Sequence, residues 1–180
     1  MTTAQLAPVV ERIDRTVLDT SDRVAALLLL SRSPEALDAP QLGLLTLVER
    51  EVERCPPLLV GKPVELNLRD PEEAWVCARP ELTGMAIGNL LRNACYYTER
   101  GEVAVLLTGS SLVIEDTGPG LPSSVRAQLF DRFVRGERES QSGAGLGLAI
   151  AKRISEHLAW DVRLEDRPGG GSRFVLLFPK

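Results

Sequence analysis

The stretch LVIEDTGPG, residues 112–120, joins an apolar strand pattern to a carboxylate and a glycine-rich turn. Side chains alternate across a strand, so Asp116 shares a face with the apolar residues two and four positions before it. The pattern predicts that this carboxylate points into the core, where it needs hydrogen-bond donors. Gly118 and Gly120 remove side chains beside it and leave room for a flat ligand. An exocyclic amine would fit that gap as a donor to Asp116.

A second glycine-rich run, GAGLGL at 143–148, leads directly into a helical pattern that we expect to span 145–159. The first N–H groups of a helix have no partner within it, and the helix dipole favours an anion there. The run therefore predicts a phosphate-binding site. The tract 134–142, between the two glycine segments, has no large apolar residue after Val134. This composition is typical of a lid that orders only when a ligand binds.

A third segment, 80–98, has the pattern of a helix that begins with a proline, which the first helical turn tolerates. Asn89, Asn93 and Tyr97 are four residues apart, so we expect them along one edge of this helix. Amide oxygens suit Mg²⁺, which also keeps several waters and shares phosphate oxygens. Two helical amides could also be merely solvated, but their combination with Asp116 favours a binding site.

These segments resemble the motifs of the catalytic ATP-binding domain of sensor histidine kinases, within the superfamily of gyrase, chaperone and mismatch-repair ATPases. The motifs occur in the family's order: an N box NLLRNACYYT at 89–98, a first glycine box at 116–120, an F box LFDRF at 129–133, a second glycine box at 143–148 and a last one, GGGSRF, at 169–174. The resemblance covers about residues 42–180. It implies a two-layer α/β sandwich, in which a mixed, mostly antiparallel sheet packs on helices.

The same resemblance implies that the chain binds ATP and Mg²⁺. Asn93 matches the family's magnesium ligand, which Asn89 assists, and Tyr97 matches the aromatic residue beside the nucleotide. Asp116 and Ser172 match the residues on the adenine side. The other matched positions are the phosphate-contacting arginines Arg132 and Arg135, the lid anchors Phe130 and Phe133, and the glycine-box residues Gly118, Gly120, Gly143, Gly145, Leu146, Gly147 and Leu148.

Two positions of the N box bear on the chemistry that the resemblance implies. The hydrolytic branches of the superfamily carry a glutamate where this chain has Asn89, so we expect phosphoryl transfer without appreciable hydrolysis. The family commonly has a lysine or arginine at the position of Tyr96, whose phenol carries no charge at neutral pH. Either the nucleotide affinity is weaker for that reason, or a lid arginine takes over the contact.

The segment 3–32 lacks glycine, and a mostly apolar series from Leu6 to Ser31, which includes Thr20, recurs in steps of four and three; this predicts a long helix with a heptad seam. Such a helix either docks on its own domain or pairs with another helix. The segment resembles the second helix of the family's dimerisation hairpin, which implies a homodimer. We therefore divide the chain into 1–38, a long helix and a hinge, and 39–180, the catalytic domain.

The phosphoacceptor histidine of that hairpin has no counterpart here. The only histidine, His157, lies in the helix that follows the second glycine box, where we expect a solvated side chain. The chain is therefore expected to be a truncated piece of a longer kinase, whose parent supplies the phosphoacceptor hairpin, or else a kinase that acts on a histidine elsewhere. The resemblance also implies a response regulator as the partner in signalling.

The remaining pattern predicts further elements of the sandwich. We expect a helix at 43–54 and a short helix at 122–131. Strands are expected in two hairpins, 64–68 with 74–78 and 102–108 with 111–116, and at 161–165 and 172–178.

Composition excludes some classes of partner. The 180 residues carry a net charge of −4, which gives no broad attraction to nucleic acid or to acidic lipid. Cys55, Cys77 and Cys95 are odd in number and show no C-x-x-C spacing, so neither a zinc site nor a disulfide framework is expected. No apolar run is long enough to span a membrane. We expect a cytoplasmic fragment without membrane contact of its own, although its parent could be anchored in the inner membrane.

Two other functions are compatible with the motifs. One is a serine-directed kinase of the anti-sigma-factor kind, against which the heptad helix and its hinge argue. The other is a degenerate module that binds nucleotide, or none, and serves in dimerisation. Tyr96 and the absent phosphoacceptor are the features that favour the degenerate module.

Overall fold

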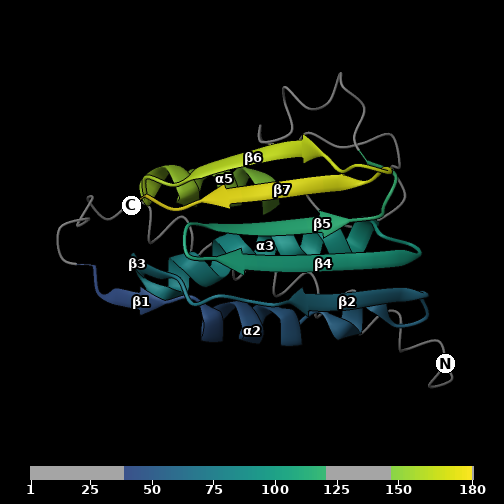
Figure 1. The fold of residues 1–180 in the computed structure, drawn as a ribbon, viewed down its shortest axis with the longest axis horizontal. Coiled ribbons are helices and arrows are strands. Elements are labelled where there is room, and N and C mark those ends of the chain that lie inside the picture. The colour runs from purple at the N-terminus through teal and green to yellow at the C-terminus, as the bar shows by residue number, and fades with distance from the viewer. Residues whose placement is uncertain (1–38, 121–146, 180) are drawn as a thin grey trace, which may run out of the picture.

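The computed structural model describes residues 39–120 and 147–179 of the chain (Figure 1). The expected long helix at 3–32, the short helix at 122–131 and the tract 134–142 lie outside the described residues. No described helix combines the length and the apolar character that crossing a bilayer requires.

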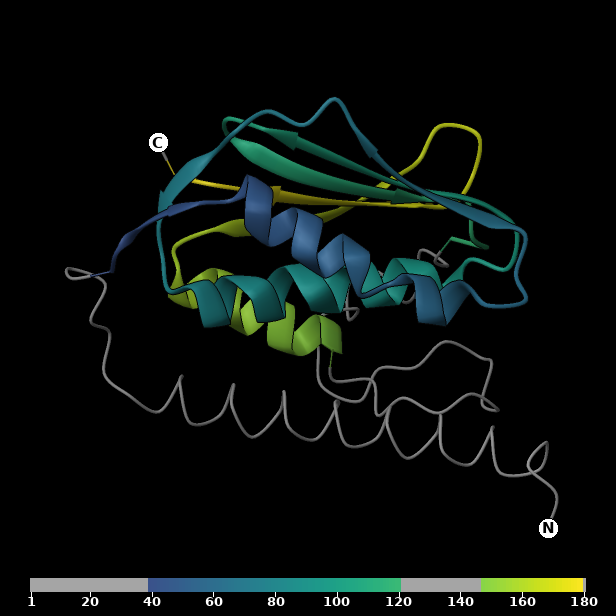
Figure 2. The ribbon, with the colours of Figure 1, turned by 90° about the horizontal axis from the view of Figure 1, so that it is seen from below.

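Five strands form the main sheet in the order β2-β4-β5-β7-β6. Their bounds are β2 Val64–Arg69, β4 Gly101–Thr108, β5 Ser111–Asp116, β6 Asp161–Asp166 and β7 Ser172–Leu177. The pair β2–β4 is parallel and the other neighbours are antiparallel. The helices α2 Leu45–Glu53, α3 Pro80–Tyr97 and α5 Gly147–His157 lie together on one face of this sheet (Figure 2). The predicted two-layer sandwich with a mixed, mostly antiparallel sheet is confirmed.

The predicted hairpin between 64–68 and 74–78 is wrong, although both segments contain strands. β2 pairs with β4, whereas β3, Trp75–Cys77, pairs with β1, Gln41–Gly43, in a separate two-stranded sheet. The segment after β2 does not turn back on β2 but continues along β4: the Glu72 N–H donates to the Leu107 carbonyl, 2.9 Å away at the carboxyl-terminal end of β4. Alternation of side chains predicts a strand but does not specify its partner.

The other predicted hairpin is confirmed. β4 and β5 pair in register, with Val105 opposite Ile114. α3 follows its predicted bounds closely, whereas the helix predicted at 43–54 is shorter, and a 3-10 turn, η1 Pro56–Leu59, comes soon after it. α5 ends at His157 because the backbone reverses at Ala159, which has a positive φ of 57°.

The core lies between the sheet and α3. Ile87, Leu90 and Leu91 of α3 are fully buried, as are Ile114 of β5 and Phe174 of β7. α5 packs along α3 (Figure 2). This packing fixes one edge of α3 between the end of β5 and the beginning of α5.

Candidate functional site

Asp116 is the last residue of β5, and its side chain is 3% exposed. Its Oδ1 accepts hydrogen bonds from the backbone N–H of Gly118 at 2.8 Å and of Ser172 at 3.3 Å. Burial raises the pKa of Asp116 above its usual range, while the donors from Gly118 and Ser172 and the charge of Arg167 act against that rise. The expected inward carboxylate with its own donors is therefore present.

Ser172 reaches Asp116 through the sheet and not through local sequence. The two residues are direct partners in the β5–β7 ladder, although they are far apart in the chain. Three glycines with positive φ, residues 169–171, form the turn that delivers Ser172. Arg167 donates to the carbonyl of Gly170 at 3.3 Å and closes this turn. Arg167 could not be identified from the sequence, because only the folded turn brings its guanidinium to that carbonyl.

The two glycine turns pack backbone against backbone. A Cβ at Gly118 would lie 2.9 Å from Asp116 Oδ1 and 3.0 Å from the Tyr97 carbonyl oxygen. A Cβ at Gly120 would lie 3.2 Å from the carbonyl oxygen of Gly171, and one at Gly171 would overlap the carbonyl oxygen of Asp116. The packing of the turns therefore requires these glycines. From the sequence, Gly118 and Gly120 were instead expected to leave room for a ligand.

Replacement of Gly171 by alanine is expected to destabilise the fold by about 3 kcal/mol, since a left-handed backbone strain of about 1–2 kcal/mol adds to the overlap with Asp116. Gly170→Ala is the matched control: its φ is +98° against +101° at Gly171, but no atom lies within 4 Å of its Cβ position. It should therefore cost only the backbone strain. Urea unfolding measures both variants, and equal losses would contradict the packing of the turns.

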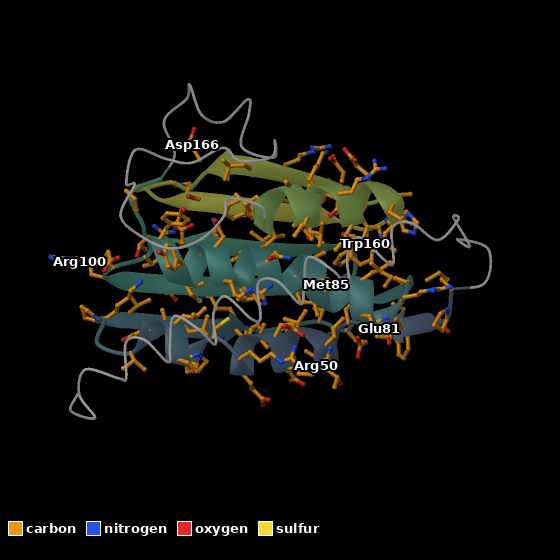
Figure 3. All side chains as sticks on the ribbon, turned by 180° about the vertical axis from the view of Figure 1, so that it is seen from behind. Arg50, Glu81, Met85, Arg100, Trp160 and Asp166 are labelled. Atoms are coloured by element: carbon orange, nitrogen blue, oxygen red, sulfur yellow. The ribbon has the colours of Figure 1, made fainter. Side chains whose placement is uncertain are left out.

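The predicted edge of α3 extends from α5 to the first glycine turn. Asn89 is 6% exposed; its Nδ2 donates to the Met85 carbonyl at 2.9 Å, and its Oδ1 accepts from Arg92 Nη2 at 3.1 Å. The same Oδ1 would lie 3.0 Å from a Cβ at Gly147, the first residue of α5. Figure 3 shows Met85 on the helical face of the molecule, on α3 between α5 and α2.

The other end of this edge is more exposed. Asn93 is half-buried, and Tyr97 is 46% exposed where α3 ends, beside Gly118. The structure therefore brings Asn89 to Gly147 and Tyr97 to the turn after Asp116, with Asn93 between them on the helix. Leu148, the second residue of α5, is half-buried against the core.

Lys62 places a positive charge near Tyr96. This charge was not expected from the sequence. Lys62 Nζ donates to the carbonyl oxygens of Tyr96 at 2.8 Å and Cys95 at 3.3 Å, and lies 5.8 Å from the centre of the Tyr96 ring. A cation at the carboxyl end of a helix is favourable for the helix dipole. No sequence pattern links Lys62 to the N box, because the contact depends on how η1 packs against α3.

The cysteines form no disulfide. Cys55 and Cys95 are buried in the core, and a hydrogen bond to Cys55 together with burial raises the pKa of Cys95 well above its usual range. Within 39–120 and 147–179, no group of three or more His, Cys, Asp or Glu side chains could hold a metal ion. Seven of the predicted site residues lie outside the described ranges: Phe130, Arg132, Phe133, Arg135, Gly143, Gly145 and Leu146.

Comparisons with known proteins agree with this geometry. The profile of the family described as "Histidine kinase-, DNA gyrase B-, and HSP90-like ATPase" matches residues 79–180. "Sensor-like histidine kinase SenX3" of Mycobacterium tuberculosis (strain ATCC 25618 / H37Rv) is 28% identical over 169 residues, which cover 88% of this chain and 41% of SenX3. "Sensor histidine kinase CpxA" of Escherichia coli (strain K12) is 37% identical over 128 residues, which cover 67% of this chain and 27% of CpxA. The chain thus spans less than half the length of these relatives.

Two solved structures have folds similar to that of this chain. "Mycobacterial sensor histidine kinase MprB" superposes with a TM-score of 0.69 at 28% identity, over 78% of this chain and 97% of the MprB chain. Full-length ShkA, solved in complex with AMPPNP, superposes with a TM-score of 0.73 at 25% identity, over 99% of this chain and 39% of the ShkA chain.

Proposed function

Because the chain belongs to the family of histidine kinase-, DNA gyrase B- and HSP90-like ATPases, we propose that it is the ATP-binding catalytic domain of a two-component sensor histidine kinase. It binds MgATP and transfers the γ-phosphoryl group to a histidine on a dimerisation hairpin. The buried carboxylate of Asp116, held between the N–H groups of Gly118 and Ser172, is the observation that carries this proposal. The similarity to SenX3 and CpxA supports a histidine kinase in particular.

Asp116 recognises the adenine base. A carboxylate is an acceptor only, so it suits the exocyclic amine of adenine and repels the carbonyl that guanine has at the same position. Gly118 and Ser172 donate to this carboxylate, and the backbone carbonyl of Tyr97 lies beside Gly118. Gly120 packs against Gly171 in the neighbouring turn.

Asn93 is the residue that fits a magnesium ion best. Its amide oxygen is a hard, neutral ligand on a half-buried edge of α3. Asn89 assists from one helical turn away, although its oxygen already accepts from Arg92. Mg²⁺ would supply charge neutralisation to the phosphate oxygens.

The phosphates lie toward the start of α5. Gly147 and Leu148 begin this helix, and its first N–H groups favour an anion. Gly143, Gly145 and Leu146 precede it in the chain. Phe130 and Phe133, which match the family's lid anchors, and Arg132 and Arg135, which match its phosphate-contacting arginines, lie outside the described residues.

Transfer, and not hydrolysis, is the reaction that this arrangement favours. At position 89 a carboxylate could take a proton from water, but Asn89 has no such capacity, and its amide is held by Met85 and Arg92. The acceptor is a hairpin supplied by the parent protein, which dimerises through the segment 1–38 and passes the phosphoryl group to a response regulator. The domain works in the cytoplasm, whether or not the parent is anchored in the inner membrane.

Calorimetric titration with a non-hydrolysable ATP analogue tests the proposal. We expect saturable binding that magnesium strengthens, and at least about tenfold weaker binding of the matching GTP analogue, because one mispaired buried contact to a charged group costs about 1.4 kcal/mol or more. No binding of either analogue would favour the degenerate module. Equal binding of the ATP and GTP analogues would show that Asp116 does not distinguish adenine from guanine.

Binding should also depend on pH through Asp116. Because burial raises its pKa, the carboxyl takes up its proton at a higher pH than the usual value of about 4. As the pH falls through that raised pKa, the acceptor is lost and the affinity for ATP falls. Titrations of ATP at a series of pH values measure the midpoint. A midpoint at or below that of a free aspartic acid would contradict this role.

A further inference from the structure

We propose that Arg92 is a phosphate-binding residue of this site, which supplies positive charge beside the phosphates of the nucleotide. This inference rests on the proposed nucleotide-binding function and adds a residue to it. Arg92 lies between Asn89 and Asn93 in the sequence of α3, and its side chain is half-buried.

The guanidinium of Arg92 and the start of α5 both lie beside the amide oxygen of Asn89. Arg92 Nη2 donates to Asn89 Oδ1 at 3.1 Å, and a Cβ at Gly147 would lie 3.0 Å from the same oxygen. The guanidinium and the first residue of α5 are thus both neighbours of Asn89. Since the first N–H groups of α5 favour an anion, a phosphate bound there lies within reach of Arg92.

The other side of the guanidinium lies near a buried carboxylate. Glu51 of α2 is 3% exposed, and its Oε2 lies 2.9 Å from the Cβ position of Gly88, while Arg92 Nη1 lies 3.0 Å from the same position. The absence of a side chain at Gly88 lets both groups occupy this space. Arg92 is therefore restrained between α2 and Asn89 before any ligand arrives, which lowers the entropy that binding must remove.

Chemistry favours this assignment. A guanidinium carries five N–H donors, so it can bind Asn89 and a phosphate oxygen at the same time. Tyr96, one turn further along α3, is uncharged at neutral pH. The nearby Lys62 is engaged with the carbonyl oxygens at the end of α3. Because Asn89 Oδ1 already accepts from a cation, Asn93 is the main ligand of the metal and Asn89 only assists.

The test compares ATP with adenosine, which lacks phosphates, in calorimetric titrations of the full chain. Arg92→Met should weaken ATP binding by about tenfold or more, the usual effect of losing a hydrogen bond to a charged group, and adenosine binding by less than about twofold. Arg92→Lys should retain most of the ATP affinity, and Tyr96→Lys should restore part of it in the Arg92→Met background. Arg153→Met removes an exposed arginine of α5, paired with Glu156, and should change neither affinity.

Adenosine binding by each variant reports that the site is folded. ATP affinity that stays within about twofold in Arg92→Met, well below the effect of a lost charged hydrogen bond, would overturn the assignment. The same holds if ATP and adenosine lose affinity equally, or if Arg92→Lys is as weak as Arg92→Met. Failure of the unaltered chain to bind ATP would overturn the proposed function and this inference with it.

Discussion

Asp116→Asn is expected to weaken ATP binding by about a hundredfold, because the amide loses the charge of the acceptor and can turn a donor toward the amine of adenine. The fold should survive, since an asparagine Oδ1 can still accept from the N–H groups of Gly118 and Ser172. Calorimetric titration with ATP measures the affinity. The pH dependence predicted for the parent chain should disappear in this variant, because the titrating carboxyl is gone.

Glu115→Gln is the matched control for this substitution. Glu115 precedes Asp116 on β5, but its carboxylate lies on the opposite face of the sheet, where it pairs with Arg173 at 3.0 Å and more distantly with Arg167 at 3.8 Å. The control makes the same chemical change one residue away and should leave ATP affinity within about twofold, since a partly exposed ion pair contributes little. If Asp116→Asn binds ATP as tightly as the control does, the carboxylate of Asp116 is structural.

Asn93→Ala is expected to remove most of the phosphoryl transfer, by about a hundredfold or more, together with the increase in ATP affinity that magnesium gives to the parent chain. In the absence of magnesium the variant and the parent should bind ATP alike. Asn93→Asp keeps an oxygen ligand and should retain more activity than the alanine variant. Transfer to an added phosphoacceptor hairpin, and titrations with and without magnesium, measure these effects.

Asn67→Ala serves as the control for Asn93→Ala. Asn67 lies on β2, where its amide donates to Glu102 at 3.0 Å, away from α3. It should affect neither transfer nor the response to magnesium. A magnesium effect that persists unchanged in Asn93→Ala would show that the metal is held by other residues.

The sequence predicted those parts of the fold and site that depend on local periodicity. The alternation of β5 placed Asp116 inward, and the spacing of four on α3 placed Asn89, Asn93 and Tyr97 along one edge. These predictions needed no knowledge of the rest of the chain. They follow from the fixed geometry of strands and helices.

The parts that were missed or wrong depend on contacts between distant segments. The partner of β2 is β4 and not β3, and alternation within β2 does not encode that choice. Similarly, the N–H of Ser172 reaches Asp116 through the register of β5 with β7, and Glu51 reaches the space beside Gly88 through the packing of α2 on α3. None of these contacts has a local sequence pattern.

Incubation of the chain with ATP labelled in the γ-phosphate, alone and with a hairpin domain from a sensor histidine kinase, tests whether the domain transfers the phosphoryl group to a histidine. We predict an acid-labile label on the histidine of the hairpin, no label on the chain alone and little release of phosphate. His157 does not serve as acceptor in this account, because it lies in the last turn of α5 and outside any hairpin. Label on the chain alone, or rapid phosphate release that Asn93→Ala does not reduce, would contradict a domain that transfers the phosphoryl group to a separate histidine.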